Sequence, residues 1–188
     1  MWNANLGRLS LMVVLIVPAA GCDSRAASAS ADEPTRYRVD AVRHRVWLLS
    51  REGVLVDDAA APGRITVSLP EWQQLLPPWG CPPDLALSPG GAAVITSNVL
   101  PTLWRIDPET LAVSVHPLEL DTDRDKDVGF SRLVYSSRDA AFFAVGAFDG
   151  SVWRIDAGLA SARKIPPHER PALALGRRTG RGTTCAQR

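Results

Sequence analysis

Four aspartates alternate with other residues between positions 121 and 127, and carboxylates spaced in this way suit a hard cation such as Ca²⁺. They are Asp121, Asp123, Asp125 and Asp127. An EF-hand loop also needs glycine at its sixth position and a bidentate glutamate at its twelfth, where this sequence has Lys126 and Arg132. Because Arg124 and Lys126 neutralise part of the charge, the pattern favours a solvated loop, with metal binding as the alternative.

Residue patterns for catalysis are harder to find. The three histidines, His44, His116 and His168, are far apart in the sequence, and none belongs to an HExxH motif. The sequence also contains no CxxC pair, no GxSxG nucleophile motif and no glycine-rich phosphate loop. We therefore expect neither enzymatic activity nor a bound cofactor.

Charge excludes one class of partner. The chain has 188 residues, with 21 Lys and Arg against 20 Asp and Glu. Nucleic-acid binding depends on basic charge that neutralises phosphates, so a neutral chain indicates no nucleic-acid partner. With 46% apolar and 22% charged residues, the composition is that of a globular domain.

The N-terminal segment has the three parts of a secretory signal. Arg8 precedes a run from Leu9 to Val17 that is apolar apart from Ser10, and small residues follow. Ala19-Ala20-Gly21-Cys22 resembles the lipobox of bacterial lipoproteins, although that family usually has Leu where Ala19 stands. The resemblance implies that residues 1–21 are removed and that Cys22 is alkylated with diacylglycerol. An ordinary secreted protein and an uncleaved anchor are the alternatives.

A lipid on Cys22 implies anchoring to a membrane of the cell envelope, with the domain facing the periplasm. The next residue, Asp23, resembles the signal that retains some lipoproteins at the inner membrane. Residues 22–36 include the stretch DSRAASASADEP, which lacks apolar periodicity and predicts a flexible tether. We expect the folded domain to span residues 37–175 and a polar tail to span 176–188.

Two cysteines remain once Cys22 is assigned to lipid. Cys81 and Cys185 form an even pair in an exported chain, which favours a disulfide between them.

An internal repeat runs through the domain. Leu103-Trp104-Arg105-Ile106-Asp107 recurs 49 residues later as Val152-Trp153-Arg154-Ile155-Asp156. A degenerate third copy is predicted around Val46-Trp47-Leu48-Leu49. One copy contains four short apolar segments separated by turn residues, at 84–87, 92–96, 103–106 and 111–117. Four short strands in each period of about 50 residues are typical of a propeller blade.

Two further motifs are similar to those of propeller blades. Ser88-Pro89-Gly90-Gly91 and Trp104-Arg105-Ile106-Asp107-Pro108-Glu109-Thr110 resemble blades of the YVTN, NHL and virginiamycin-B-lyase-like β-propellers. This resemblance implies an all-β fold and does not specify a reaction.

The number of blades is unusual, because closed propellers have 4 to 8. The chain has room for about three, and Pro171 to Leu175 echoes the start of another copy. Three interpretations compete: an open stack that pairs with a partner or a second copy, a truncated or frame-shifted relative of a longer propeller, and a compact β-sandwich.

Tryptophans repeat with the blade period. Trp47, Trp104 and Trp153 are predicted to occupy equivalent positions and to pack between adjacent sheets. Between the first and second copies, the apolar spacing from Glu71 to Leu76 together with Trp79 predicts a short helix.

Taken together, these patterns predict a membrane-anchored envelope lipoprotein with a partial propeller. Its domain is expected to bind or scaffold another protein or ligand, or to self-associate. The alternative is a truncated relative of a propeller enzyme, either a virginiamycin-B-lyase-like lyase or a quinone-dependent enzyme, without retained activity.

Overall fold

The computed structural model describes residues 36–60, 63–75, 81–121 and 128–169, all within one compact unit. Regular structure in these ranges is almost entirely β, apart from one 3-10 turn, η2 (Pro167–Glu169). No helix in the ranges just given is long and apolar enough to cross a membrane.

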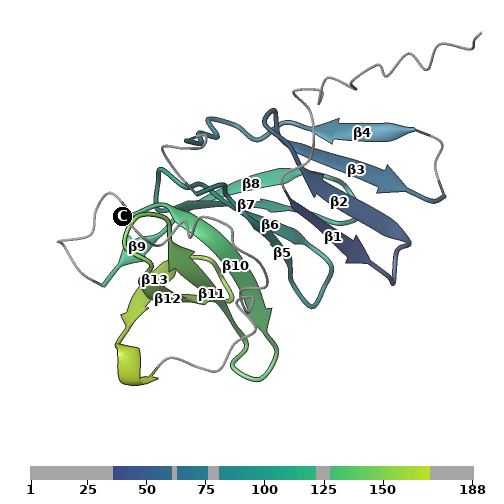
Figure 1. Cartoon of the computed structure of the whole chain (residues 1–188). Coiled ribbons are helices and arrows are strands. Elements are labelled where there is room, and N and C mark those ends of the chain that lie inside the picture. The colour runs from purple at the N-terminus through teal and green to yellow at the C-terminus, as the bar shows by residue number, and fades with distance from the viewer. Residues whose placement is uncertain (1–35, 61–62, 76–80, 122–127, 170–188) are drawn as a thin grey trace, which may run out of the picture. The chain divides into compact units, whose positions relative to one another are not determined.

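The strands form three sheets, antiparallel except for one short added strand, and we call their four-stranded meanders blades 1, 2 and 3 (Figure 1). Blade 1 contains β1 (Arg36–Asp40), β2 (Arg45–Leu49), β3 (Val54–Asp58) and β4 (Arg64–Val67). Blade 2 contains β5 (Leu85–Leu87), β6 (Ala93–Thr96), β7 (Thr102–Ile106) and β8 (Val113–Pro117). Blade 3 contains β10 (Phe130–Ser136), β11 (Ala141–Gly146), β12 (Val152–Asp156) and β13 (Ser161–Ile165).

Within each blade, strands that follow one another in sequence are also neighbours in the sheet. One short strand departs from this pattern, because β9 (Glu119–Leu120) follows blade 2 in sequence and pairs in parallel with β13 of blade 3. Three separate meander sheets rule out the β-sandwich interpretation, and the fold is a partial β-propeller-like stack. The strands predicted for the second copy agree with β5 to β8.

An aspartate at the end of the third strand makes the same turn in every blade. The carboxylates of Asp58, Asp107 and Asp156 each accept a hydrogen bond from the backbone N–H two residues later, at 2.9, 3.0 and 2.8 Å. Aspartate is favoured at such turns because its short side chain replaces a backbone acceptor. The pKa of all three carboxyls is lowered, at Asp58 chiefly by the hydrogen bond from Arg45 and at Asp107 chiefly by that from the N–H of Thr110, and the shared turn hydrogen bonds add to the effect. The three aspartates therefore give a structural alignment of the blades.

This alignment corrects one prediction about the tryptophans. Trp104 and Trp153 lie on third strands, β7 and β12, three residues before the turn aspartate. Trp47 lies on β2, the second strand of blade 1, and the third-strand position there belongs to Leu55. All three tryptophan side chains are buried, but Trp47 is not equivalent to the other two. The sequence copy around Trp47 is therefore displaced by one strand.

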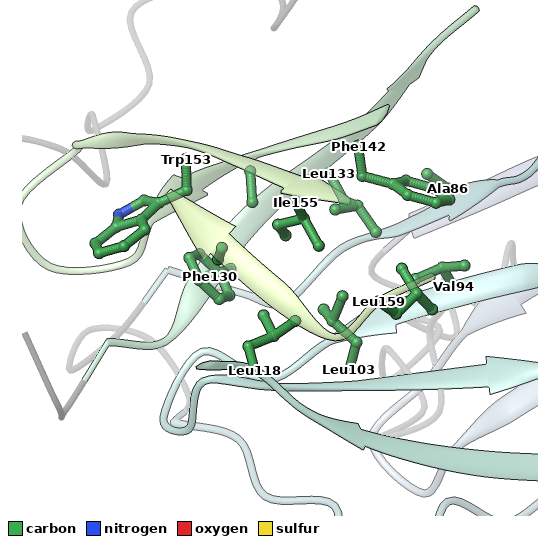
Figure 2. Close-up of a cluster of buried hydrophobic side chains, with 12 residues drawn as sticks. Ala86, Val94, Leu103, Leu118, Phe130, Leu133, Phe142, Trp153, Ile155 and Leu159 are labelled. Carbon is green, nitrogen blue, oxygen red and sulfur yellow. The ribbon is translucent and has the colours of Figure 1, made fainter. Parts of the chain in front are cut away.

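Apolar side chains fill the space between consecutive blades. Blade 1 contributes Trp47, Leu49, Val54, Val56 and Val67 to the first cluster, and blade 2 contributes Leu85, Ala93, Ile95, Trp104 and Ile106. A second cluster lies between blades 2 and 3 (Figure 2). It includes Ala86, Val94, Leu103 and Leu118 from blade 2 and its following loop, with Phe130, Leu133, Phe142, Trp153 and Ile155 from blade 3.

The predicted helix between the first two copies is wrong for residues 71–75, which have no helical structure. Their backbone groups bond to blade 2 instead of to one another. The Asn98 side chain accepts from the N–H of Leu75 at 2.8 Å, and the Ser97 hydroxyl donates to the carbonyl of Gln73 at 2.8 Å. A helix this short would also be unfavourable by itself, because forming the first turn costs free energy and few further hydrogen bonds would follow to offset that cost. Leu76 and Trp79 lie outside the described residues.

Candidate functional site

Several residues singled out from the sequence lie outside the described ranges. These are Cys22, Cys185, Asp123, Asp125 and Asp127. Cys81 is buried, and because Cys185 lies outside the described residues, the disulfide between them stays a prediction. Asp121 is exposed, and its carboxylate accepts a hydrogen bond from the backbone N–H of Lys164 at 3.1 Å. Within the part of the chain that the structure describes, no group of three or more His, Cys, Asp and Glu residues could hold a metal ion.

The three histidines lie on different parts of the fold. His44 is in the turn between β1 and β2, His116 is on β8, and His168 is in η2. The imidazole of His116 is 2.9 Å from the Ser114 hydroxyl, two residues away on the same strand. Partial burial, together with the charge of Arg105, lowers the pKa of His116. The structure does not bring the histidines together into one site.

Blade 1 has one buried and one open face. The buried face carries Trp47 and Val56 against blade 2. On the opposite face, Tyr37 and Val39 of β1 are 64% and 58% exposed. Val46, Leu48 and Leu55 lie beside them in the sheet and are half-buried. We call these five residues, Tyr37, Val39, Val46, Leu48 and Leu55, the open face of blade 1.

The strand registers show what this face corresponds to in the other blades. Three residues align across the first three strands of each blade: Tyr37, Leu48 and Leu55; Leu85, Ile95 and Trp104; Leu133, Ala144 and Trp153. The rows of blades 2 and 3 are buried against the preceding blade. Blade 1 therefore exposes apolar side chains at the positions that blades 2 and 3 use to pack against the preceding blade.

Sequence reasoning missed this face because it aligned blade 1 by its tryptophan. The repeated aspartate was the better signal, since aligning Asp58 with Asp107 places Leu55 at the position of Trp104. Asp57 then takes the position of Ile106, and its carboxylate is paired with Arg64 at 2.8 Å. This ion pair gives the apolar face a charged border.

A buried carboxylate joins the first strands of the three blades. Asp84, which immediately precedes β5, accepts hydrogen bonds from the N–H of Leu85 at 2.9 Å and from the N–H of Leu133 on β10 at 3.1 Å. The guanidinium of Arg38 on β1 is 3.1 Å away, and that of Arg36 is 3.8 Å away. Burial raises the pKa of Asp84, and the charge of Arg38 and both N–H groups offset part of the rise.

The same two arginines border an open hollow of about 420 Å³ along β1. It is lined by four consecutive residues, Arg36, Tyr37, Arg38 and Val39. The arginine side chains are 40% and 36% exposed, whereas that of Asp84 is only 8% exposed. A ligand in this hollow would therefore meet positive charge on one side of the strand and apolar surface on the other.

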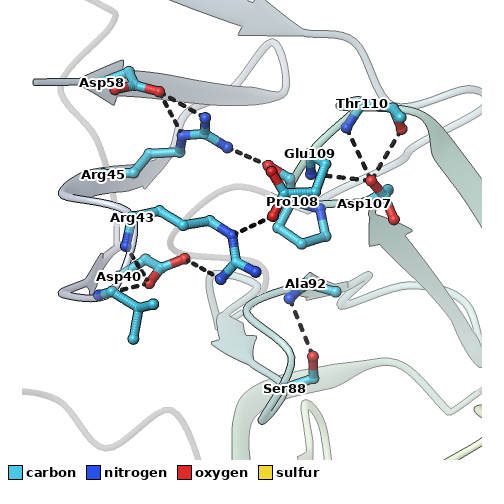
Figure 3. Close-up of polar contacts among 11 residues, drawn as sticks. Asp40, Arg43, Arg45, Asp58, Ser88, Ala92, Asp107, Pro108, Glu109 and Thr110 are labelled. Carbon is cyan, nitrogen blue, oxygen red and sulfur yellow. Dashed lines mark hydrogen bonds and ion pairs between the residues drawn. The ribbon is translucent and has the colours of Figure 1, made fainter. Parts of the chain in front are cut away.

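Polar contacts at the turn between β1 and β2 fix the position of blade 1 against blade 2 (Figure 3). The guanidinium of Arg43 is 2.7 Å from the carboxylate of Glu109. Arg45 pairs with Asp58 of its own blade at 2.6 Å and donates to the carbonyl of Pro108 in blade 2. These contacts engage Arg43 and Arg45, which do not line the hollow, whereas its described basic residues are Arg36 and Arg38.

The described residues thus define a member of the β-propeller class of folds, with three blades and a hollow at the first strand. No protein-family model matches the chain, and no curated protein matches it in sequence. Among solved structures, it is similar to virginiamycin B lyase from Staphylococcus aureus, with a TM-score of 0.52 and 15% identity over 73% of this chain and 43% of that one.

A second similar structure is YCF48 from Cyanidioschyzon merolae. Its TM-score is 0.50 and its identity 14%, over 75% of this chain and 42% of that one. The chain spans less than half the length of both proteins, and at these identities the likeness concerns the fold alone. It supports the propeller-like assignment of the three blades.

Proposed function

We propose that the protein is an envelope lipoprotein whose partial propeller binds another protein through the open face of blade 1 and the hollow beside it. The observation that carries the proposal is the exposure of Tyr37 and Val39. Their counterparts in blades 2 and 3, where the fold repeats, are packed against a neighbouring sheet. Exposed apolar surface bordered by charged residues is typical of a protein interaction site.

The position of the domain in the cell follows from the N-terminal motif. A lipid on Cys22 would hold the domain at the periplasmic side of a membrane, and Asp23 favours the inner membrane. The near-neutral charge of the chain supports a protein partner over nucleic acid.

Binding is proposed in preference to catalysis. Virginiamycin B lyase shows that a fold of this class can carry an enzyme. In this chain, however, the described histidines are divided among three elements, and Asp84 is occupied by backbone N–H groups and Arg38. The alternative, a truncated relative of a propeller enzyme without activity, shares the same open face and would bind through it as well.

The proposal is tested by crosslinking at a single position in living cells. A photoreactive phenylalanine analogue placed at Val39 is expected to form a covalent adduct with a partner protein on illumination. Val115 is the matched control, because it is also an exposed valine in a strand, at 44% exposure, but lies on the outer strand β8 of blade 2. An adduct of twice the chain mass would identify a second copy as the partner. No adduct at Val39, or the same adducts at Val115, would contradict the proposal.

A further inference from the structure

The first strand of blade 1 has a backbone edge outside the sheet. Among the described strands the order is β1-β2-β3-β4, so β1 pairs with β2 along one edge and no described strand pairs with its other edge (Figure 1). The other edge runs along the hollow lined by Arg36, Tyr37, Arg38 and Val39. A strand edge of this kind is a template on which an extended peptide can add as a further strand.

The side chains of β1 would contact those of an added strand on both faces of the sheet. Successive residues of a strand point to opposite faces of the sheet, so Arg36 and Arg38 lie on one face and Tyr37 and Val39 on the other. Opposite charges on adjacent strands attract, and apolar pairs pack. A complementary strand would therefore place acidic residues beside the arginines and apolar residues beside Tyr37 and Val39.

The charges around the hollow favour an acidic ligand. Asp84 is the carboxylate that faces Arg38, and it is almost fully covered. Asp40, at the end of β1, is also buried, and it pairs with Arg43 at 3.1 Å. Among the described residues that line the hollow, the ionised groups are therefore the guanidiniums of Arg36 and Arg38, which share the single covered carboxylate of Asp84.

We infer that β1 binds an extended peptide segment, in which acidic and apolar residues alternate, by adding it as an extra strand to blade 1. This inference rests on the proposed function and specifies the chemistry of its partner. Main-chain hydrogen bonds along the edge supply the attachment, and the alternating side chains supply the selectivity.

The test uses the full chain, purified in a mild non-ionic detergent, and end-blocked fluorescent hexapeptides. A peptide of alternating Glu and Val is expected to bind at least about tenfold more tightly than one of alternating Lys and Val, because the side chains of the second repel both arginines. It should also bind more tightly than a peptide of three Glu followed by three Val, which has the same composition without the alternation.

Methylation of the peptide backbone tests strand addition without changing the protein. An added strand donates to β1 from every second residue only. N-methylation at one alternate set of residues is therefore expected to abolish binding, and N-methylation at the other set should leave it intact. Equal binding of both methylated peptides would overturn the inference, as would equal binding of the Lys and Glu peptides.

A protein variant supplies the remaining control. Arg36→Gln should weaken binding of the Glu and Val peptide several-fold, whereas Arg154→Gln, at an exposed arginine of blade 3, should not change it. If no peptide binds but Val39 still forms its position-specific adduct, strand addition is wrong and the proposed function stands. If both experiments fail, both proposals fall.

Discussion

Replacing Trp153 with alanine is expected to lower the free energy of unfolding by about 3 to 5 kcal/mol. Its indole is fully buried between blades 2 and 3, meets the ring of Phe130 edge-on at 6.1 Å, and donates a hydrogen bond to the Ser151 hydroxyl at 2.7 Å. Native domains are stable by only about 5 to 15 kcal/mol, so this loss would remove a large part of the total.

Trp104→Ala should have a similar effect, because its indole is buried between blades 1 and 2 and donates to the carbonyl of Pro70 at 2.8 Å. Arg105→Ala is the matched control on the same strand, and its exposed side chain should contribute less than about 0.5 kcal/mol. Urea unfolding of the full chain measures the difference. Equal midpoints for Trp104→Ala and Arg105→Ala would contradict the interblade packing.

Phenylalanine substitutions should distinguish Trp47 from Trp153. The indole N–H of Trp47 is buried without a hydrogen-bond partner among the described residues. Trp47→Phe removes this unsatisfied donor, whereas Trp153→Phe breaks a hydrogen bond and leaves the Ser151 hydroxyl without it. In the same unfolding series, Trp47→Phe should therefore be the milder change.

Loss of the lipid is the second large effect that we expect. In cells fed a clickable fatty acid, the wild-type chain should carry the label, and Cys22→Ser should abolish it and leave the precursor uncleaved. The reason is that the lipobox resemblance makes the Cys22 thiol the alkylated atom, and stable anchoring depends on more than one acyl chain. Cys81→Ser is the control, and it should keep the label. A Cys22→Ser chain that is cleaved and released normally would refute the anchor.

Local pattern was enough to predict the second and third blades. The turns at Ser88 to Gly91 and at Asp107 to Thr110 depend on residues that set their own backbone geometry, and the apolar runs between them are short enough to be strands. The all-β fold and the propeller-like repeat follow from these features. Each rests on interactions within a single blade.

The features that sequence reasoning missed depend on contacts beyond the local segment, either within a sheet or between blades. Trp47 and Trp104 stand in similar local sequences, but the first lies on a second strand and the second on a third strand, as the sheet registers show. Residues 71–75 have helical spacing, yet Ser97 and Asn98 of the next blade take their polar groups. Asp84 likewise meets its partner Leu133 from a distance of 49 residues in the sequence.

The exposure of the open face of blade 1 also depends on contacts beyond the local segment. Tyr37, Leu48 and Leu55 look like core residues in sequence, and their counterparts in blades 2 and 3 are core residues. What distinguishes them is the blade to which they belong. Their exposure is a property of the assembled stack. Aligning Asp58 with Asp107 identifies the equivalent positions in the sequence, but it does not show that those of blade 1 are uncovered.

The most direct test of the account is the reactivity of a thiol on that face. In a Val39→Cys chain, maleimide labelling should be fast in the purified protein and about tenfold or more slower in the intact envelope, where a bound partner excludes the reagent. Val115→Cys should be labelled at the same rate in both settings, and the parent chain gives the background from its own cysteines. If Val39→Cys reacts as fast in the envelope as in the purified protein, the open face is unoccupied and the binding role is contradicted.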